Sequence, residues 1–131
     1  LIDCPPNLGE LTRNALYASD SALVITEPSF FAVQSAAQAV ESIEVARRAG
    51  HDDLQLVGIL ATRVRKRQPE HTYRMAELHD AFGDVVLDPI PDRAAIQQAQ
   101  GACMPVQRWR SAVAELLTTV LATPANGRRT N

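Results

Sequence analysis

An aspartate follows the first two apolar residues of the chain, and prolines follow it closely. The opening LIDCPP is typical of a short apolar strand that ends at Asp3, because Pro5 and Pro6 cannot continue the strand ladder. In doubly wound sheets, ligands bind beyond the carboxyl ends of the strands. Mg²⁺ takes a carboxylate or two together with phosphate oxygens and water. Asp3 is therefore a candidate for holding a hydrated magnesium ion; the competing interpretation is a polar residue that only ends a strand.

A basic run is the second place with possible chemistry. The stretch RVRKRQPEHTYR, residues 63–74, holds five basic side chains and one acidic one. Residues 1–60 carry a net charge of −5 and residues 61–131 a net charge of +3, so a polyanion contact belongs to the later part. Arg65, Lys66 and Arg67 predict a contact with a phosphate backbone. A solvated loop is the competing interpretation.

Other kinds of chemistry find little support in the residue pattern. His51, His71 and His79 do not share metal-ligand spacing, and Cys4 and Cys103 lie far apart, as free thiols do. The 131 residues contain no G-x-x-x-x-G-K-[ST] phosphate loop and no nucleophile with a paired base. No apolar run approaches the roughly 18 residues that cross a bilayer. We therefore assign no catalytic residue within this chain.

Alternating strand and helix patterns must position these residues. Apolar runs predict strands at 1–3, 21–26, 54–62 and 84–91, and helical spacing predicts helices at 8–19, 31–49, 70–81, 93–101 and 105–122. This order predicts an α/β fold with three layers, in which a mostly parallel sheet carries helices on both faces. The polar, turn-rich residues 123–131 predict a disordered tail after a domain of residues 1–122.

Three stretches together resemble one family. LIDCPPNLGELTRNALYASDSALVITEPSFFAVQS closely resembles the Walker B segment of ParA-type partition ATPases, in the deviant-Walker P-loop group that includes the MinD proteins. GILATRVRKR resembles the strand and loop beside the base pocket, and DPIPDRAAIQQAQGACMPV resembles the Ile-Pro segment and short helix. The resemblance implies a P-loop NTPase-like fold. It also implies that residues 1–122 correspond to the C-terminal half of the ATPase domain, without the phosphate-loop half.

The resemblance implies a nucleotide site for ATP and Mg²⁺ in the intact protein. Asp3 matches the Walker B aspartate, which holds Mg²⁺ through water. Thr62 and Arg63 match residues near the adenine edge. Pro91, Asp92 and Arg93 match the loop that closes over the base.

The resemblance also implies partners. The ATP-bound protein is expected to be a homodimer, with residues 9–14 and the start of the 31–49 helix near the dimer face. It is expected to bind DNA without sequence preference, to act with a ParB-like protein and to be cytoplasmic, at the nucleoid and not on a membrane. The expected DNA contacts are Arg65, Lys66, Arg67 and Arg93.

Some positions depart from the family pattern, and alternatives stay open. Asp92 and Ala95 stand where many chromosomal relatives have arginines, Cys103 stands where glycine is common, and Ser35 replaces another small glycine. A MinD-like positioning ATPase and a relative of cobyrinic acid synthase would share the fold. A non-enzymatic fragment that only binds partners is a different class, and the chain alone is expected to be inactive as an ATPase.

Overall fold

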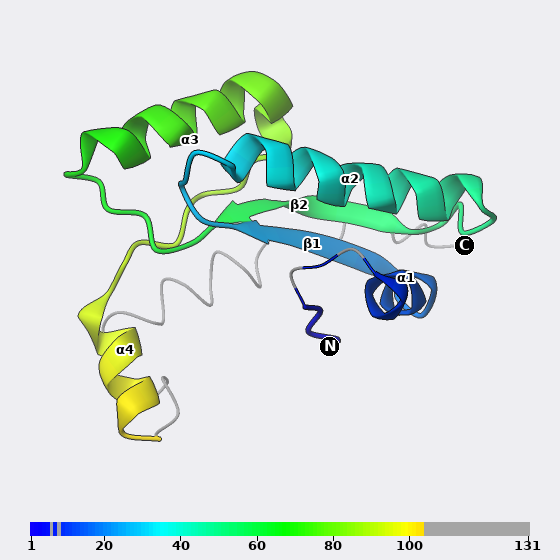
Figure 1. Cartoon of the computed structure of the whole chain (residues 1–131), viewed down its shortest axis with the longest axis horizontal. Helices are drawn as coiled ribbons and strands as arrows, with labels where there is room; N and C mark the ends of the chain where they lie inside the picture. Colours follow the sequence, from blue (N-terminus) through cyan, green and yellow to red (C-terminus); the bar gives the residue numbers. More distant parts are fainter. Residues whose placement is uncertain (6, 8, 104–131) are drawn as a thin grey trace, which may run out of the picture.

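Two parallel strands with helices around them form the fold (Figure 1). The computed structural model describes residues 1–5, 7 and 9–103. The order of elements and the parallel pairing confirm the predicted α/β class. The elements are α1 (Glu10–Tyr17), β1 (Ser21–Thr26), α2 (Ala32–Arg48), β2 (Gln55–Ala61), α3 (Pro69–Phe82), the 3-10 turn η1 (Gly83–Val85) and α4 (Ala94–Gly101).

The strands β1 and β2 pair from Ser21 with Gln55 to Thr26 with Ala61. The register shifts once, because Leu23 pairs with Gly58 and leaves Val57 as an extra residue in β2. The last four residues of β2 are buried, as expected for a strand inside a parallel sheet. Continuous apolar runs in the sequence predicted both strands correctly.

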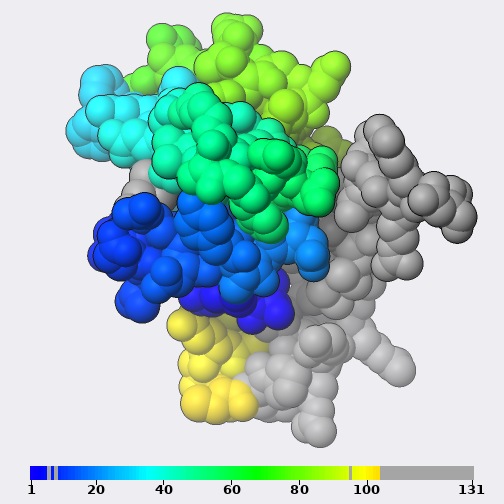
Figure 2. All heavy atoms as spheres, turned by 90° about the vertical axis from the view of Figure 1, so that its right-hand side faces the viewer, coloured from blue at the N-terminus to red at the C-terminus, as the bar shows by residue number. Residues whose placement is uncertain are grey.

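Helices α2 and α3 lie on one side of the strands, and α4 lies on the other side in Figure 1. The buried residues of α2 recur at helical spacing and pack toward β1: Ala32, Ala36, Ile43 and Ala46. Helix α3 contributes Leu78, which is fully buried with Leu54 and Ile59. Helix α1 lies against α2, as Figure 2 shows from the right-hand side of Figure 1. The buried core is therefore aliphatic, in keeping with an aromatic content of only 5%.

A glycine in a left-handed conformation follows the end of α2. Gly50 has a φ of 105°, which an L side chain rarely adopts. Its N–H donates to the carbonyl oxygen of Arg47 at 3.1 Å, and the N–H of His51 donates to that of Ala46 at 3.2 Å. This pair of bonds is a Schellman motif, which satisfies the last carbonyl groups of the helix.

Two predicted strands do not form. Residues 1–3 have no regular structure, and Leu1 and Ile2 are exposed; within the described residues, no strand pairs with them. Residues 84–91 follow β2 and the residues after it through isolated parallel bridges, one from Val86 to Ile59 in β2 and one from Pro91 to Val64 beyond its end. Pro89 and Pro91 lack the N–H groups that a regular ladder needs, so this segment follows β2 without becoming a strand.

The predicted helix at 105–122 and the predicted tail at 123–131 lie outside the described residues. Among the described helices, none has the length and apolar character needed to span a membrane.

Candidate nucleotide edge and basic turn

Thr62, the residue after β2, is hydrogen-bonded to Thr26, the last residue of β1. The backbone N–H of Thr62 donates to the carbonyl oxygen of Thr26 at 2.8 Å, and its hydroxyl approaches the same oxygen at 3.3 Å. Thr62 is half-buried, directly after the last residue of β2. Its side chain therefore helps to close the end of the sheet, and the chain leaves the sheet at the next residue.

Arg63 turns the chain at this edge. Its φ is 56°, in the left-handed region, which costs a non-glycine residue about 1 kcal/mol. Its guanidinium lies 3.0 Å from the carboxylate of Glu27, the residue after the end of β1, and both side chains are exposed. Sequence reasoning missed Glu27. The signal was available, because a parallel pair of strands brings the residues after their carboxyl ends together.

Residues 87–92 lie along the end of β2 through backbone hydrogen bonds. Leu87 and Ile90 donate to the carbonyl oxygens of Ile59 and Ala61 at 2.9 and 2.8 Å. Beyond the strand, Val64 donates to Ile90 at 3.0 Å and accepts from the N–H of Asp92 at 3.0 Å. The loop of Pro91 and Asp92 is thereby fixed beside the residues that follow β2.

An ion pair connects the two loops at this edge. Nε of Arg65 donates to Oδ2 of Asp92 at 2.7 Å. The Asp92 side chain is only 16% exposed, whereas that of Arg65 is 63% exposed. The backbone N–H of Arg65 donates to Nδ1 of His71 on α3 at 3.0 Å. One predicted DNA contact is therefore bound to one residue of the predicted nucleotide loop.

We use the name basic turn for Lys66 and Arg67. These residues form a turn closed by a hydrogen bond from the N–H of Gln68 to the carbonyl oxygen of Arg65 at 2.9 Å. Both are exposed, and within the described part of the chain neither takes part in a salt bridge. The basic turn therefore presents two cations to solvent.

Arg74, the remaining cation of the basic run, belongs to α3 and not to this surface. Its guanidinium lies 2.7 Å from both Glu77 and Glu70, and its side chain is only 14% exposed. Hydrogen bonds to Glu77 and Glu70 raise the pKa of Arg74, so it stays charged. Its guanidinium also stacks on the rings of Phe30 and Tyr73. Arg74 thus stabilises the contact between α3 and the start of α2.

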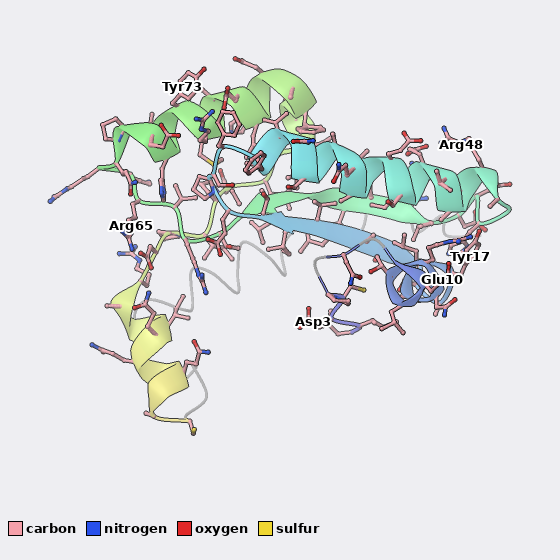
Figure 3. The ribbon with its side chains drawn as sticks, in the orientation of Figure 1. Asp3, Glu10, Tyr17, Arg48, Arg65 and Tyr73 are labelled. Carbon is pink, nitrogen blue, oxygen red and sulfur yellow. The ribbon has the colours of Figure 1, made fainter. Side chains whose placement is uncertain are left out.

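Asp3 lies away from this edge. It is exposed in the irregular segment beneath β1 and beside α1, well apart from Arg65 (Figure 3). Among the described residues, no group of three or more His, Cys, Asp or Glu side chains could hold a metal ion. A single carboxylate has the right chemistry for water-mediated Mg²⁺ contact but does not by itself form a magnesium site. The role of Asp3 stays a prediction for the intact protein.

Arg93 precedes α4 and is exposed, with its carbonyl oxygen accepting from Ile96 at 3.0 Å. Cys103, which follows the end of α4, has a φ of 51°. The left-handed backbone conformation that favours glycine is thus present at Cys103.

A shallow hollow of about 120 Å³ lies between α1 and α2. None of the predicted site residues lines it, because it is formed by Arg13, Leu16, Tyr17, Glu41, Ser42, Val45 and Ala46. The hollow is thus separate from the predicted nucleotide and DNA residues. Except for Asp3, those residues lie in two loops at the carboxyl end of the β1–β2 sheet.

Comparison with known proteins shows what this chain is similar to. A family model described as an AAA domain matches residues 1–56. The chromosome partitioning protein ParA of Caulobacter vibrioides is 33% identical over 107 residues, which are 81% of this chain and 40% of that protein. The sporulation initiation inhibitor protein Soj of Bacillus subtilis is 30% identical over 107 residues, covering 81% of this chain and 42% of its own length. The chain thus spans about two-fifths of these relatives.

A solved structure of cobyrinic acid a,c-diamide synthase from Mycobacterium smegmatis, with bound ADP and magnesium, has the same fold. It matches 88% of this chain and 45% of its own length, with a TM-score of 0.62 and 28% sequence identity. Sequence and fold therefore agree, and both support a relationship of this chain to the ParA-type proteins of the ParA/MinD superfamily of P-loop ATPases.

Proposed function

We propose that this chain is part of an ATP-dependent DNA partition ATPase that segregates chromosomes or plasmids. The observation that carries the proposal is the meeting of Thr62, Arg63 and the Pro91–Asp92 loop at one edge, with the basic turn beside them. Relatives that are named chromosome partitioning proteins support the proposed partition function. The carboxyl edge of a parallel sheet is where such folds bind ligands.

The residues of the edge would form a rim for the flat base of a nucleotide. Arg63 turns the chain out of the sheet, which leaves the backbone of Thr62 at the rim. The hydrogen bonds between Val64 and the 90–92 segment fix the opposite side of the rim. ATP with Mg²⁺ supplies the phosphoanhydride bond that is hydrolysed, and Asp3 would act on the metal through water once the phosphate loop is present.

The basic turn would contact DNA through phosphates and not through bases. Lys66 and Arg67 are exposed cations on a short turn, and such contacts carry no sequence information. An ATP-bound homodimer would double the number of cations, which makes binding stronger and more sensitive to salt. Non-specific DNA binding would keep the protein at the nucleoid, and a ParB-like partner would stimulate hydrolysis and release.

The test uses the intact protein that contains this chain. We expect it to bind unrelated duplex DNA sequences with equal affinity, in ATP but not in ADP, and to hydrolyse ATP faster when DNA is present. The 131-residue chain alone serves as the control and should show only background hydrolysis, because it lacks a phosphate loop. ATP-independent DNA binding, or none, would overturn the proposal.

The structural match to a diamide synthase favours one second candidate, an ATP-dependent amidating enzyme. Such an enzyme has no need of a cationic surface for polyanions. If the intact protein hydrolyses ATP only with a carboxylate substrate and an amide donor, and ignores DNA, this candidate replaces the first.

A further inference from the structure

The ion pair between Arg65 and Asp92 carries an inference that rests on the proposed DNA-binding function. Nε of Arg65 and Oδ2 of Asp92 lie 2.7 Å apart and join two loops separated by 27 positions in the sequence. We propose that Asp92 is an internal competitor of DNA phosphates: it holds Arg65 and lowers the number of cations that the protein offers to DNA.

The backbone holds both partners in position for this competition. The N–H of Asp92 donates to the carbonyl oxygen of Val64 at 3.0 Å, and the N–H of Arg65 donates to Nδ1 of His71 at 3.0 Å. The Arg65 side chain is the longer and more exposed partner, so its ordering makes up most of the entropic cost of the pair. Since the Asp92 carboxylate is only 16% exposed, water screens this pair less than it screens a fully exposed pair.

Neighbouring cations differ from Arg65 in this respect. Lys66 and Arg67 are exposed and, in the described part of the chain, form no salt bridge. Arg63 pairs with Glu27, but these two side chains are 69% and 54% exposed, so that acid is a weaker competitor. Phosphates should therefore engage the basic turn first and Arg65 only when Asp92 releases it.

The experiment measures the affinity of the intact, ATP-saturated protein for a duplex of arbitrary sequence across a range of salt concentrations. Asp92→Asn should raise the affinity about fivefold at 0.1 M salt and steepen the log affinity against log salt slope by about 0.9, the value for one added phosphate contact. Adding Arg65→Ala to this variant should remove the gain. In the otherwise unchanged protein, Arg65→Ala should weaken binding less than Lys66→Ala does.

Asp88→Asn is the matched control. Asp88 is an exposed carboxylate on the same segment, so its replacement changes the net charge equally without touching Arg65. Its salt slope should stay unchanged. Equal gains from Asp92→Asn and Asp88→Asn, or a gain that survives Arg65→Ala, would overturn the inference, and thermal unfolding of each variant verifies its fold.

A second probe separates this inference from the proposed function. If the intact protein shows no ATP-dependent DNA binding, the proposed function fails, and the same variants are then compared on inorganic polyphosphate. Tighter polyphosphate binding by Asp92→Asn than by Asp88→Asn, dependent on Arg65, supports the competition. Equal binding overturns it.

Discussion

The two ends of the β1–β2 sheet hold their polar side chains in different ways. At the amino end, Nε of Arg47 donates to the carbonyl oxygen of Leu54 at 2.7 Å, and Nε2 of His51 lies 2.8 Å from that of Ser19. At the carboxyl end, Arg63 and Arg65 pair instead with carboxylates on neighbouring loops. Arg47 and His51 thus bind backbone carbonyl groups across the amino end, although Arg47 also pairs with Glu44, whereas Arg63 and Arg65 reach across the carboxyl end only to carboxylates.

This difference separates stability from function. The contacts at the amino end are partly buried, and a partly buried carbonyl that loses its partner pays a desolvation cost, so these contacts serve stability. Exposed ion pairs contribute only about 0–1 kcal/mol, and a charged ligand can take the place of one partner. The proposed binding of a nucleotide and a polyanion at the carboxyl end would therefore cost the fold little.

The largest effect should come from adding a methyl group where the 85–87 segment meets β2. A Cβ at Gly58 would lie 2.7 Å from Cγ of Leu87 and 2.9 Å from the carbonyl oxygen of Val85. Gly58→Ala should lower the free energy of unfolding by about 2 kcal/mol, because the backbone of the segment has to shift. Urea unfolding of the intact protein measures this loss.

The control for that change lies at the amino end. A Cβ at Gly50 meets nothing within 4 Å, so Gly50→Ala should cost only the left-handed backbone strain, about 1 kcal/mol. It should leave nucleotide and DNA affinity unchanged, whereas Gly58→Ala should weaken both. Equal losses of stability, or an unaltered carboxyl edge in Gly58→Ala, would contradict the close packing described above.

The next effect concerns DNA. Replacing Lys66 and Arg67 together by alanine should weaken DNA binding roughly tenfold and flatten the salt slope by about 1.8, because two phosphate contacts are lost. The loss should be the same for unrelated sequences. Arg48→Ala removes an exposed cation at the amino end (Figure 3) and should leave the slope unchanged. An unchanged slope in the double variant would make the basic turn an ordinary solvated loop.

The smallest effect should come from relieving backbone strain after α4. Cys103 has a φ of 51°, so Cys103→Gly removes a steric penalty but adds flexibility to the unfolded chain. We expect a net gain of about 0.5 kcal/mol in thermal unfolding, with no change in DNA affinity. Destabilisation by this substitution would show that the cysteine side chain contributes packing.

Local sequence pattern by itself determined the regular elements between α1 and α3. The continuous apolar run Ser21–Thr26 became β1 without a change of bounds, and the helical stripe before Gly50 became α2. Each of these segments buries a face whose period is readable from the residues themselves. Three motif-bearing stretches also indicated the family. The roles of the nucleotide residues stay predictions; the structure brings Thr62, Arg63 and the Pro91–Asp92 loop to one edge and leaves Asp3 away from it.

Tertiary structure alone decided the rest. Leu1–Asp3 has the composition of a strand but lacks a paired strand among the described residues, and residues 84–91 follow β2 only where their prolines allow. A strand depends on backbone groups elsewhere in the chain, which its own residues do not specify. The pairing of Arg65 with Asp92 likewise depends on which loops the sheet brings together, because charge is visible in a sequence and distance is not.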